Sequence, residues 1–193
     1  MIRSSHPILK QRICRAFGLS CVLICLSLHI QPACAQDILK DANSIIVEAR
    51  TEVLCKSMTQ SIEKESLTIS VLNRKGLEAA RFFCGCDMFR SLQKFSGEIL
   101  NATGQSVRKI KKSELQKSEY SSSLTTDDYF YYYECNHPSF PFTVKYEWEM
   151  KCNNGLIGYL PFVPQAEFNQ GVEKATYRIE LPAGQGCKIG RAS

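Results

Sequence analysis

The side chains best suited to covalent chemistry in this 193-residue chain are its ten cysteines, which outnumber its three histidines. Beyond residue 35 the cysteines are Cys55, Cys84, Cys86, Cys135, Cys152 and Cys187, and the one histidine is His137. A thiol and an imidazole could form a nucleophile and base pair, with an acid such as Asp87, Asp127 or Asp128 orienting the ring. No spacing selects one of the cysteines, so we assign no catalytic residue and expect that the chain alone is not an enzyme.

Metal and nucleotide chemistry find little support in the sequence. Zinc sites use several histidines or paired C-x-x-C motifs, whereas Cys84-Gly85-Cys86 is C-x-C with no second pair. Gly184-Gln185-Gly186 matches the first two glycines of a dinucleotide-binding fingerprint, but Ile189 stands where the third glycine is required. We therefore predict no metal and no cofactor.

A predicted N-terminal leader changes the charge and the number of cysteines of the mature chain. Basic residues lead into an apolar run over 19–28, and this run is followed by Ala33-Cys34-Ala35, which is the order of a secretory signal with its cleavage site. We predict a cleavable signal peptide at residues 1–35 and export to the periplasm or cell surface. A membrane-spanning helix needs roughly 20 apolar residues, so no transmembrane segment is expected. The alternative, a lipid anchor on Cys34, is disfavoured because Gln31 stands where lipoprotein signals carry a leucine-like residue.

Removal of the leader leaves a nearly neutral chain. Four of the 24 basic residues and none of the 19 acidic residues lie in the leader, so the charge predicts no nucleic-acid partner. The six remaining cysteines are an even number in an exported chain, which permits disulfides. We expect at least one bond among them, and the sequence leaves the pairing open.

Apolar and polar residues alternate with a period of two through much of the mature chain. The clearest run is Phe142 to Met150, and similar runs cover 45–53, 67–71, 77–88 and 175–181. Only 87–95 and 111–118 are expected to form short helical turns. Sheets with one apolar face must cover that face with another sheet. We therefore predict an all-β domain over 36–183, an antiparallel β-sandwich with few short helical turns, followed by an irregular tail at 184–193.

Five consecutive aromatic residues mark a candidate binding surface. On a strand, Tyr129, Tyr131 and Tyr133 share one face, while Phe130 and Tyr132 take the other. Exposed tyrosines could stack on a sugar or peptide, or anchor a neighbouring domain. Packing across strands or over the sandwich edge is the alternative. We take the three tyrosines as candidate residues for binding a protein or peptide partner.

A set of motifs in a fixed order resembles one protein family. The motifs lie at 42–47, 71–76, 100–104 with 111–115, 140–147 and 179–182, and they read ANSIIV, VLNRKG, LNATG with KKSEL, FPFTVKYE and IELP. Together they resemble the domain of unknown function 3857, which is found at the N-terminus of transglutaminase-like envelope proteins of bacteria. The resemblance spans about Asp41 to Pro182.

The resemblance implies a β-sandwich module that precedes a transglutaminase-like or cysteine-protease-like core with a Cys-His-Asp triad. Few residues follow Pro182, so none of that triad can be placed on this sequence. We expect a non-catalytic binding or scaffold module of the bacterial envelope, with a transglutaminase-like domain as one candidate partner. The alternative is a truncated N-terminal fragment of such an enzyme, whose catalytic core is missing from this chain.

Overall fold

The computed structural model describes residues 41–119, 127–154 and 162–184, which all belong to the compact unit Ile38–Ser193. The predicted leader with Cys34, residue Cys187 and nearly all of the predicted tail lie outside the described residues. Neither of the two short helices found in these ranges has the length and hydropathy of a membrane span.

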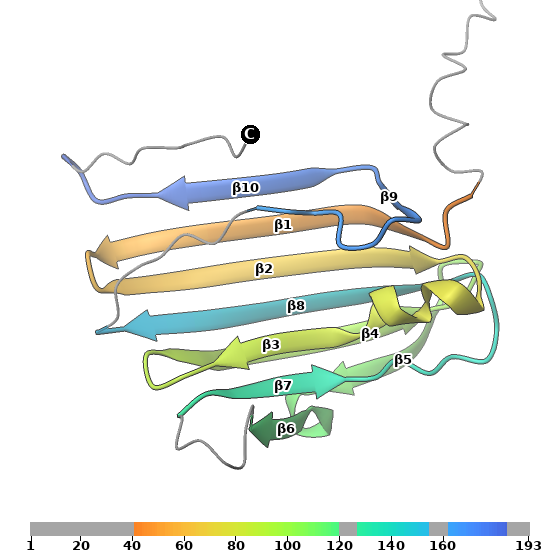
Figure 1. Cartoon of the computed structure of the whole chain (residues 1–193), viewed down its shortest axis with the longest axis horizontal. Coiled ribbons are helices and arrows are strands. Elements are labelled where there is room, and N and C mark those ends of the chain that lie inside the picture. Colours follow the sequence, from red (N-terminus) through yellow and green to blue (C-terminus); the bar gives the residue numbers. More distant parts are fainter. Residues whose placement is uncertain (1–40, 120–126, 155–161, 185–193) are drawn as a thin grey trace, which may run out of the picture. The chain divides into compact units, whose positions relative to one another are not determined.

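A seven-stranded sheet forms the frame of the domain (Figure 1). Its strands follow the order β10-β1-β2-β8-β4-β5, and β9 also pairs with β1. The bounds are β1 Ser44–Ser57, β2 Gln60–Val71, β4 Arg90–Leu100, β5 Ser106–Lys111, β8 Phe142–Asn153, β9 Gln170–Val172 and β10 Ala175–Glu180. Neighbouring strands are antiparallel except that β9 and β10, one after the other, run parallel to β1.

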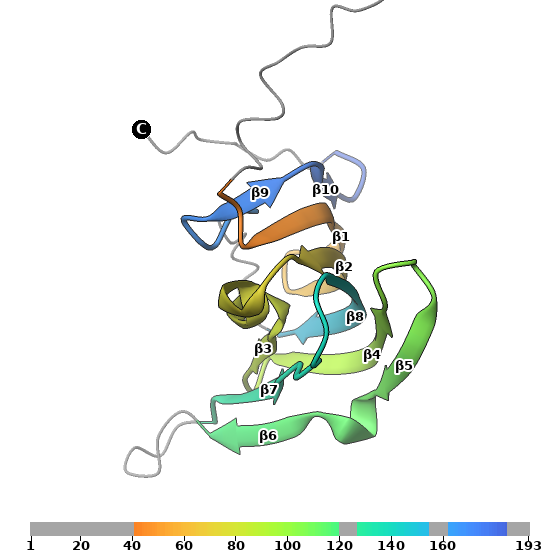
Figure 2. The ribbon, with the colours of Figure 1, turned by 90° about the vertical axis from the view of Figure 1, so that its right-hand side faces the viewer.

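A second sheet of three strands packs on this frame (Figure 2). It consists of β3 Phe82–Cys86, β7 Tyr129–Tyr133 and β6 Gln116–Glu119, in the order β3-β7-β6 with antiparallel pairing. We call the face of the larger sheet that looks toward it the inner face, and the opposite face the outer face. Both sheets contribute to one buried cluster, in which the ring of Phe82 lies 5.4 Å from that of Tyr146. The predicted all-β sandwich is confirmed.

The alternation along β8 explains why this strand is central to the core. Phe142, Val144, Tyr146 and Met150 are buried on the inner face, whereas Lys145 and Glu147 between them are exposed. The hydroxyl of Tyr146 donates a hydrogen bond of 2.8 Å to the carbonyl oxygen of Ala80, so its polar atom is satisfied where it is buried.

Two local predictions were wrong. Residues 77–88 do not form one strand, because Asn73 caps a 3-10 helix, η1 Arg74–Ala80, before β3 begins. Gly76 permits this helix to approach β1 closely, since a Cβ atom there would lie 2.1 Å from the carbonyl oxygen of Asn43.

Residues 87–95 form no helical turn, because Asp87 Oδ1 accepts the backbone N–H groups of Phe89 and Arg90 and thereby starts strand β4. The other expected helical turn is present as the 3-10 helix η2 Lys112–Glu114.

Candidate functional site

The inner face changes character along its strands. A row of paired residues near one end is apolar and buried, and it contains Ile46, Ile69, Val144 and Ile99. Two rows further along, five strands contribute Tyr177, Thr51, Glu65, Trp148 and Phe95 in register. The next row places Glu63 on this same face, because residues two apart on a strand share a face. The inner face therefore carries two carboxyl groups where a sandwich core is normally apolar.

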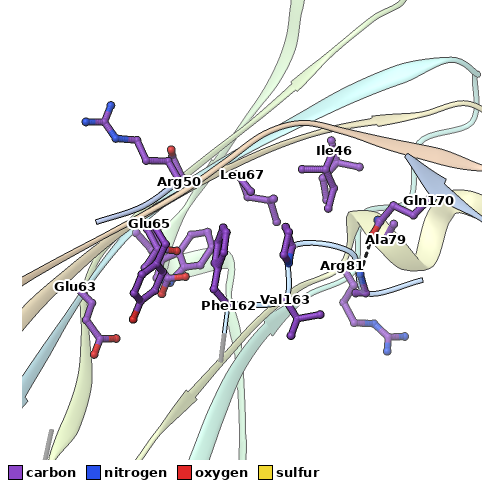
Figure 3. Close-up of a pocket in the computed structure, with 18 of the residues that line it drawn as sticks. Ile46, Arg50, Glu63, Glu65, Leu67, Ala79, Arg81, Phe162, Val163 and Gln170 are labelled. Atoms are coloured by element: carbon purple, nitrogen blue, oxygen red, sulfur yellow. Dashed lines mark hydrogen bonds between the residues drawn. The ribbon is translucent and has the colours of Figure 1, made fainter. Parts of the chain in front are cut away.

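A cavity of about 430 Å³ lies over these carboxyl groups (Figure 3). It is bounded by the inner face of the larger sheet, by η1 and by residues 162–170. Its apolar walls include Leu67, Trp148, Phe162, Val163 and Tyr177. Ligand cavities in proteins measure about 300–1,000 Å³ and combine apolar walls with a few polar groups, and this cavity has both properties.

The wall at residues 162–170 is attached to the sheet through Gln170, which is only 6% exposed. Its Nε2 donates to Ser44 Oγ at 3.3 Å, and its Oε1 accepts the backbone N–H of Ala166 at 3.0 Å. At the other end of the segment, the ring of Phe162 lies 5.3 Å from that of Tyr177 on β10. The wall is thus held at both ends.

Glu65 is the most perturbed carboxyl group of the cavity. Its Oε1 accepts a hydrogen bond of 3.1 Å from the indole N–H of Trp148. Burial, and then the nearby charge of Glu63, raise the pKa of Glu65 to about 7, although the hydrogen bonds from Trp148 and Thr51 favour the carboxylate. The group therefore changes its charge near neutral pH.

The other charges at the cavity are compensated differently. Arg90 Nη2 lies 2.8 Å from Glu63 Oε2, and Arg81 Nη1 lies 2.6 Å from Glu78 Oε1. Arg50 forms an ion pair with Glu52, and its guanidinium points away from the cavity (Figure 3). Glu65 forms no salt bridge within the described part of the chain. The charge of Arg90 also favours the carboxylate of Glu65, but the group belongs to no ion pair and is available to bind a ligand.

Within the described ranges, His137 contacts an aromatic ring and a backbone carbonyl rather than a thiol. The His137 ring packs against Phe142 at 4.9 Å, and its Nδ1 lies 2.9 Å from the carbonyl oxygen of Ser139. Cys84 and Cys86 face the core from β3, where the Cys84 Sγ lies 3.2 Å from Met150 Sδ. The hydrogen bond between the two thiols lowers the pKa of Cys86 and raises that of Cys84.

The other cysteines of the described ranges, Cys55, Cys135 and Cys152, are also buried. Burial raises the pKa of the Cys135 thiol to about 11, while Cys55 and Cys152 lie on either side of Ser61 on the inner face. Among the described residues no two sulfur atoms are at bonding distance. A disulfide that involves Cys187, which lies outside those residues, stays a prediction. In the same ranges, no three His, Cys, Asp or Glu side chains gather as they would around a metal ion.

The three predicted tyrosines face the larger sheet. Tyr133 is buried, and Tyr129 and Tyr131 are half-buried and pack against the core, with Lys117 Nζ 3.9 Å from the centre of the Tyr129 ring. Ligand binding at Tyr129, Tyr131 and Tyr133 stays a prediction, but little of their surface is accessible. The opposite face of the small sheet carries Phe83, which is 52% exposed and lies 5.0 Å from Phe130.

The sequence prediction missed the residues of the cavity, although one signal for them was present. The alternation of Leu67, Ile69 and Val71 continues backward with the same phase to Glu65 and Glu63. Extending the alternation backward by two repeats, which is four residues, would have placed both carboxyl groups on the apolar face of the strand. The same alternation places Trp148 and Tyr177 on the apolar faces of their strands, but only strand pairing between distant segments brings them and Arg90 close to the two glutamates.

Comparisons with known proteins give a fold but no family. No protein-family profile matches the chain, and no curated protein is similar to it. Among solved structures, the chain is similar to a "putative protease" of Parabacteroides distasonis, with a TM-score of 0.60 and 9% identity over 74% of this chain. The chain spans only 29% of the length of that protein. At this identity the likeness shows a shared fold alone.

A second solved structure is a "putative nutrient binding protein" of Legionella pneumophila, which matches 59% of this chain and 41% of its own at 9% identity. Its TM-score of 0.30 is too low to inform the fold.

Proposed function

We propose that this chain is a non-catalytic binding module of the bacterial envelope, exported by its leader to the periplasm or cell surface. The observation that carries the proposal is the cavity on the inner face, which combines aromatic walls with the Glu65 carboxyl group. Binding rather than catalysis is favoured because the imidazole of His137 contacts Phe142 and Ser139 instead of a thiol.

The similarity to one part of a larger protein supports an accessory role. Many multidomain proteins join a binding module to a separate catalytic domain, and the shared fold here covers 29% of the Parabacteroides protein. The ordered motifs that resemble the domain of unknown function 3857 point the same way. We infer that the partner is a protein or peptide, with a transglutaminase-like domain as one candidate.

Activity measurements on the purified, processed protein test the proposal. We expect no peptide hydrolysis and no transamidation of a glutamine peptide by an amine, together with saturable ligand binding reported by the fluorescence of Trp148. Trp148 is the only tryptophan in the chain and it lines the cavity. Hydrolysis or transamidation that disappears in Cys86→Ala or Cys135→Ala would contradict the proposal.

The similarity to part of a larger protein also favours a second candidate, the N-terminal portion of a transglutaminase-like or cysteine-protease-like enzyme. The genomic sequence after the codon for Ser193 tests it. A coding stretch with Cys, His and Asp in the order of such a core would support the enzyme, and unrelated sequence would exclude it.

The N-terminus of the processed protein tests the localisation. Cleavage by the general signal peptidase would give a protein that begins at Gln36, whereas a lipoprotein would begin at a modified Cys34. We expect the intact mass of the secreted protein to correspond to residues 36–193.

A further inference from the structure

The charges that line the cavity do not cancel. The guanidinium group of Arg50 points away from the cavity, which leaves those of Arg81 and Arg90. These two form ion pairs with Glu78 and Glu63, which line the same cavity. Glu65 has no such partner among the described residues, and it lies on the sheet beneath the walls rather than at an exposed position. Glu167, the other carboxyl group of the lining without an ion pair in these residues, is exposed to solvent. A ligand that supplied one positive charge could therefore pair with Glu65, the unpaired carboxyl group that the sheet holds away from solvent.

The hydrogen bonds of Glu65 leave room for a donor from a ligand. A carboxylate offers about four acceptor positions, and Trp148 and Thr51 account for two of them. Both donors belong to the sheet, on β8 and β1, so the carboxyl group is oriented before any ligand arrives. An ammonium group carries donors that could use the remaining positions.

The walls suit a chain of methylene groups that ends in such a cation. Trp148, Tyr177 and Phe162 line the cavity together with Leu67, which gives aromatic and aliphatic surface next to Glu65. Methylene groups of long basic side chains pack readily on apolar surface. Aromatic rings also attract cations that lie over their faces.

We propose that the cavity binds an alkylammonium group, with the carboxylate of Glu65 as its counter-ion and the aromatic walls against its methylene chain. This inference rests on the proposed binding function and names the ligand class. The chemistry is shared by a lysine side chain in a peptide and by a free alkylamine, and the experiment below separates these two sources.

The proposal implies a direction for the pH dependence of binding. The pKa of Glu65 near 7 means that the carboxylate, which the cation requires, is the minor form at pH 6 and the major form at pH 8. The apparent affinity scales with the fraction of the competent form, so binding should be about tenfold tighter at pH 8 than at pH 6. The titratable groups that face Glu65 or share the lining of its cavity are Glu63, Arg90, Cys84, Tyr177, Glu78, Arg81, Glu167 and Arg50, whose guanidinium points away.

Trp148 fluorescence provides the measurement, with N-acetyl-lysine-N-methylamide as the probe. We expect saturable binding at pH 8 that weakens about tenfold at pH 6, and at least tenfold weaker binding of the norleucine analogue, which lacks the ammonium group. Equal binding of n-butylamine would assign the site to free amines, and tighter binding of the lysine probe would assign it to a residue in a peptide. Either result supports the proposal.

The variant Glu65→Gln should abolish binding of the lysine probe while keeping the shape of the side chain. Glu147→Gln, an exposed residue next to Trp148 on the outer face, is the matched control and should bind as the parent does. A pH titration of the fluorescence without any probe gives a readout independent of the variants, with an expected midpoint near 7.

Three outcomes would overturn the inference: equal affinity for the lysine and norleucine probes, tighter binding of the lysine probe at pH 6, or no binding of it at all. If the lysine probe fails but uncharged peptides still bind and change the fluorescence of Trp148, only the ligand class is wrong. Thiol-dependent hydrolysis or transamidation would instead contradict the proposed non-catalytic function, whatever the probes show.

Discussion

The two faces of the larger sheet use charge in opposite ways. On the outer face, Arg178, Glu52, Lys64, Glu149 and Lys94 lie in one row across five strands, so that the sign alternates from strand to strand. The adjacent row on the inner face consists of Tyr177, Thr51, Glu65, Trp148 and Phe95. Each outer carboxylate has a basic residue on either side, whereas Glu65 lies between a threonine and a tryptophan.

This difference shows how one sheet can be both a scaffold and a site. The charge pairs of the outer row favour one strand register, because a slip by one residue would place each charge opposite an uncharged or like-charged neighbour. The inner row holds an ionisable group at a partly buried position where its charge is costly. The outer face stabilises the frame, and the inner face keeps a carboxyl group available.

The largest expected effect is the loss of a core side chain from the inner face. Phe142 is only 1% exposed, so Phe142→Ala should lower the free energy of unfolding by about 3–5 kcal/mol. Lys145→Ala, an exposed residue of the same strand on the outer face, should change it by no more than about 0.5 kcal/mol. Urea denaturation of both variants measures the contrast, and similar losses would contradict the assignment of the faces.

The next effect concerns the pH dependence of stability. Glu65 keeps its proton to higher pH in the folded protein than in the unfolded chain, so its protonated form favours the folded state. This contribution to the free energy of unfolding is complete below about pH 4.5 and is lost as the pH rises through 7. The loss amounts to about 3 kcal/mol. Glu65→Gln should remove it, which urea denaturation at pH 5 and pH 8 would reveal. Glu147→Gln should retain it.

A third prediction adds volume to the inner face instead of removing it. A Cβ atom at Gly97 would lie 3.0 Å from Ile110 Cβ and 3.1 Å from Tyr146 Cδ1. Gly97→Ala should therefore lower the free energy of unfolding by about 1–3 kcal/mol through overpacking. Ser96→Ala, its exposed neighbour on the outer face, is the control and should be close to neutral. A stable Gly97→Ala variant would mean that the packing around Ile110 can relax.

The smallest effect is expected in the outer row. Lys64→Glu would face Glu52 and Glu149 on the two adjacent strands, and it should cost about 1 kcal/mol at low salt. In about 1 M salt, where screening acts over roughly 3 Å, most of this cost should disappear. Thermal unfolding at two salt concentrations measures it. A cost that does not depend on salt would show that Lys64 contributes through packing rather than charge.

Much of the frame follows from local patterns, and much of the site does not. The alternation from Phe142 to Met150 identifies β8 and its buried face correctly, because each residue is placed by the two-residue period alone. At the start of β1 the predicted alternation is wrong by one residue. A pairing irregularity between Ile46 and Glu48 places Ile46 rather than Ile45 in the core. A bulge of this kind depends on the partner strand, which the local sequence does not specify.

The tyrosines illustrate the same limit. The period of two correctly groups Tyr129, Tyr131 and Tyr133 on one face of β7, but it cannot say which face meets the larger sheet. That choice depends on contacts with residues far away in the sequence. The cavity is harder still, because its row joins Tyr177, Glu65 and Trp148 from three separate strands.

The attachment of Gln170 to Ser44 has a further consequence for the way the domain opens. Residues 162–170 form a wall of the cavity and lead directly into β9 and β10, which dock on β1. Wall and strands should therefore detach from the rest of the sheet as one cooperative unit, and their amide hydrogens should exchange with solvent at a common rate. Occupation of the cavity would then slow exchange throughout this unit, including the residues of β9 and β10 other than Gln170 and Tyr177, which do not line the cavity.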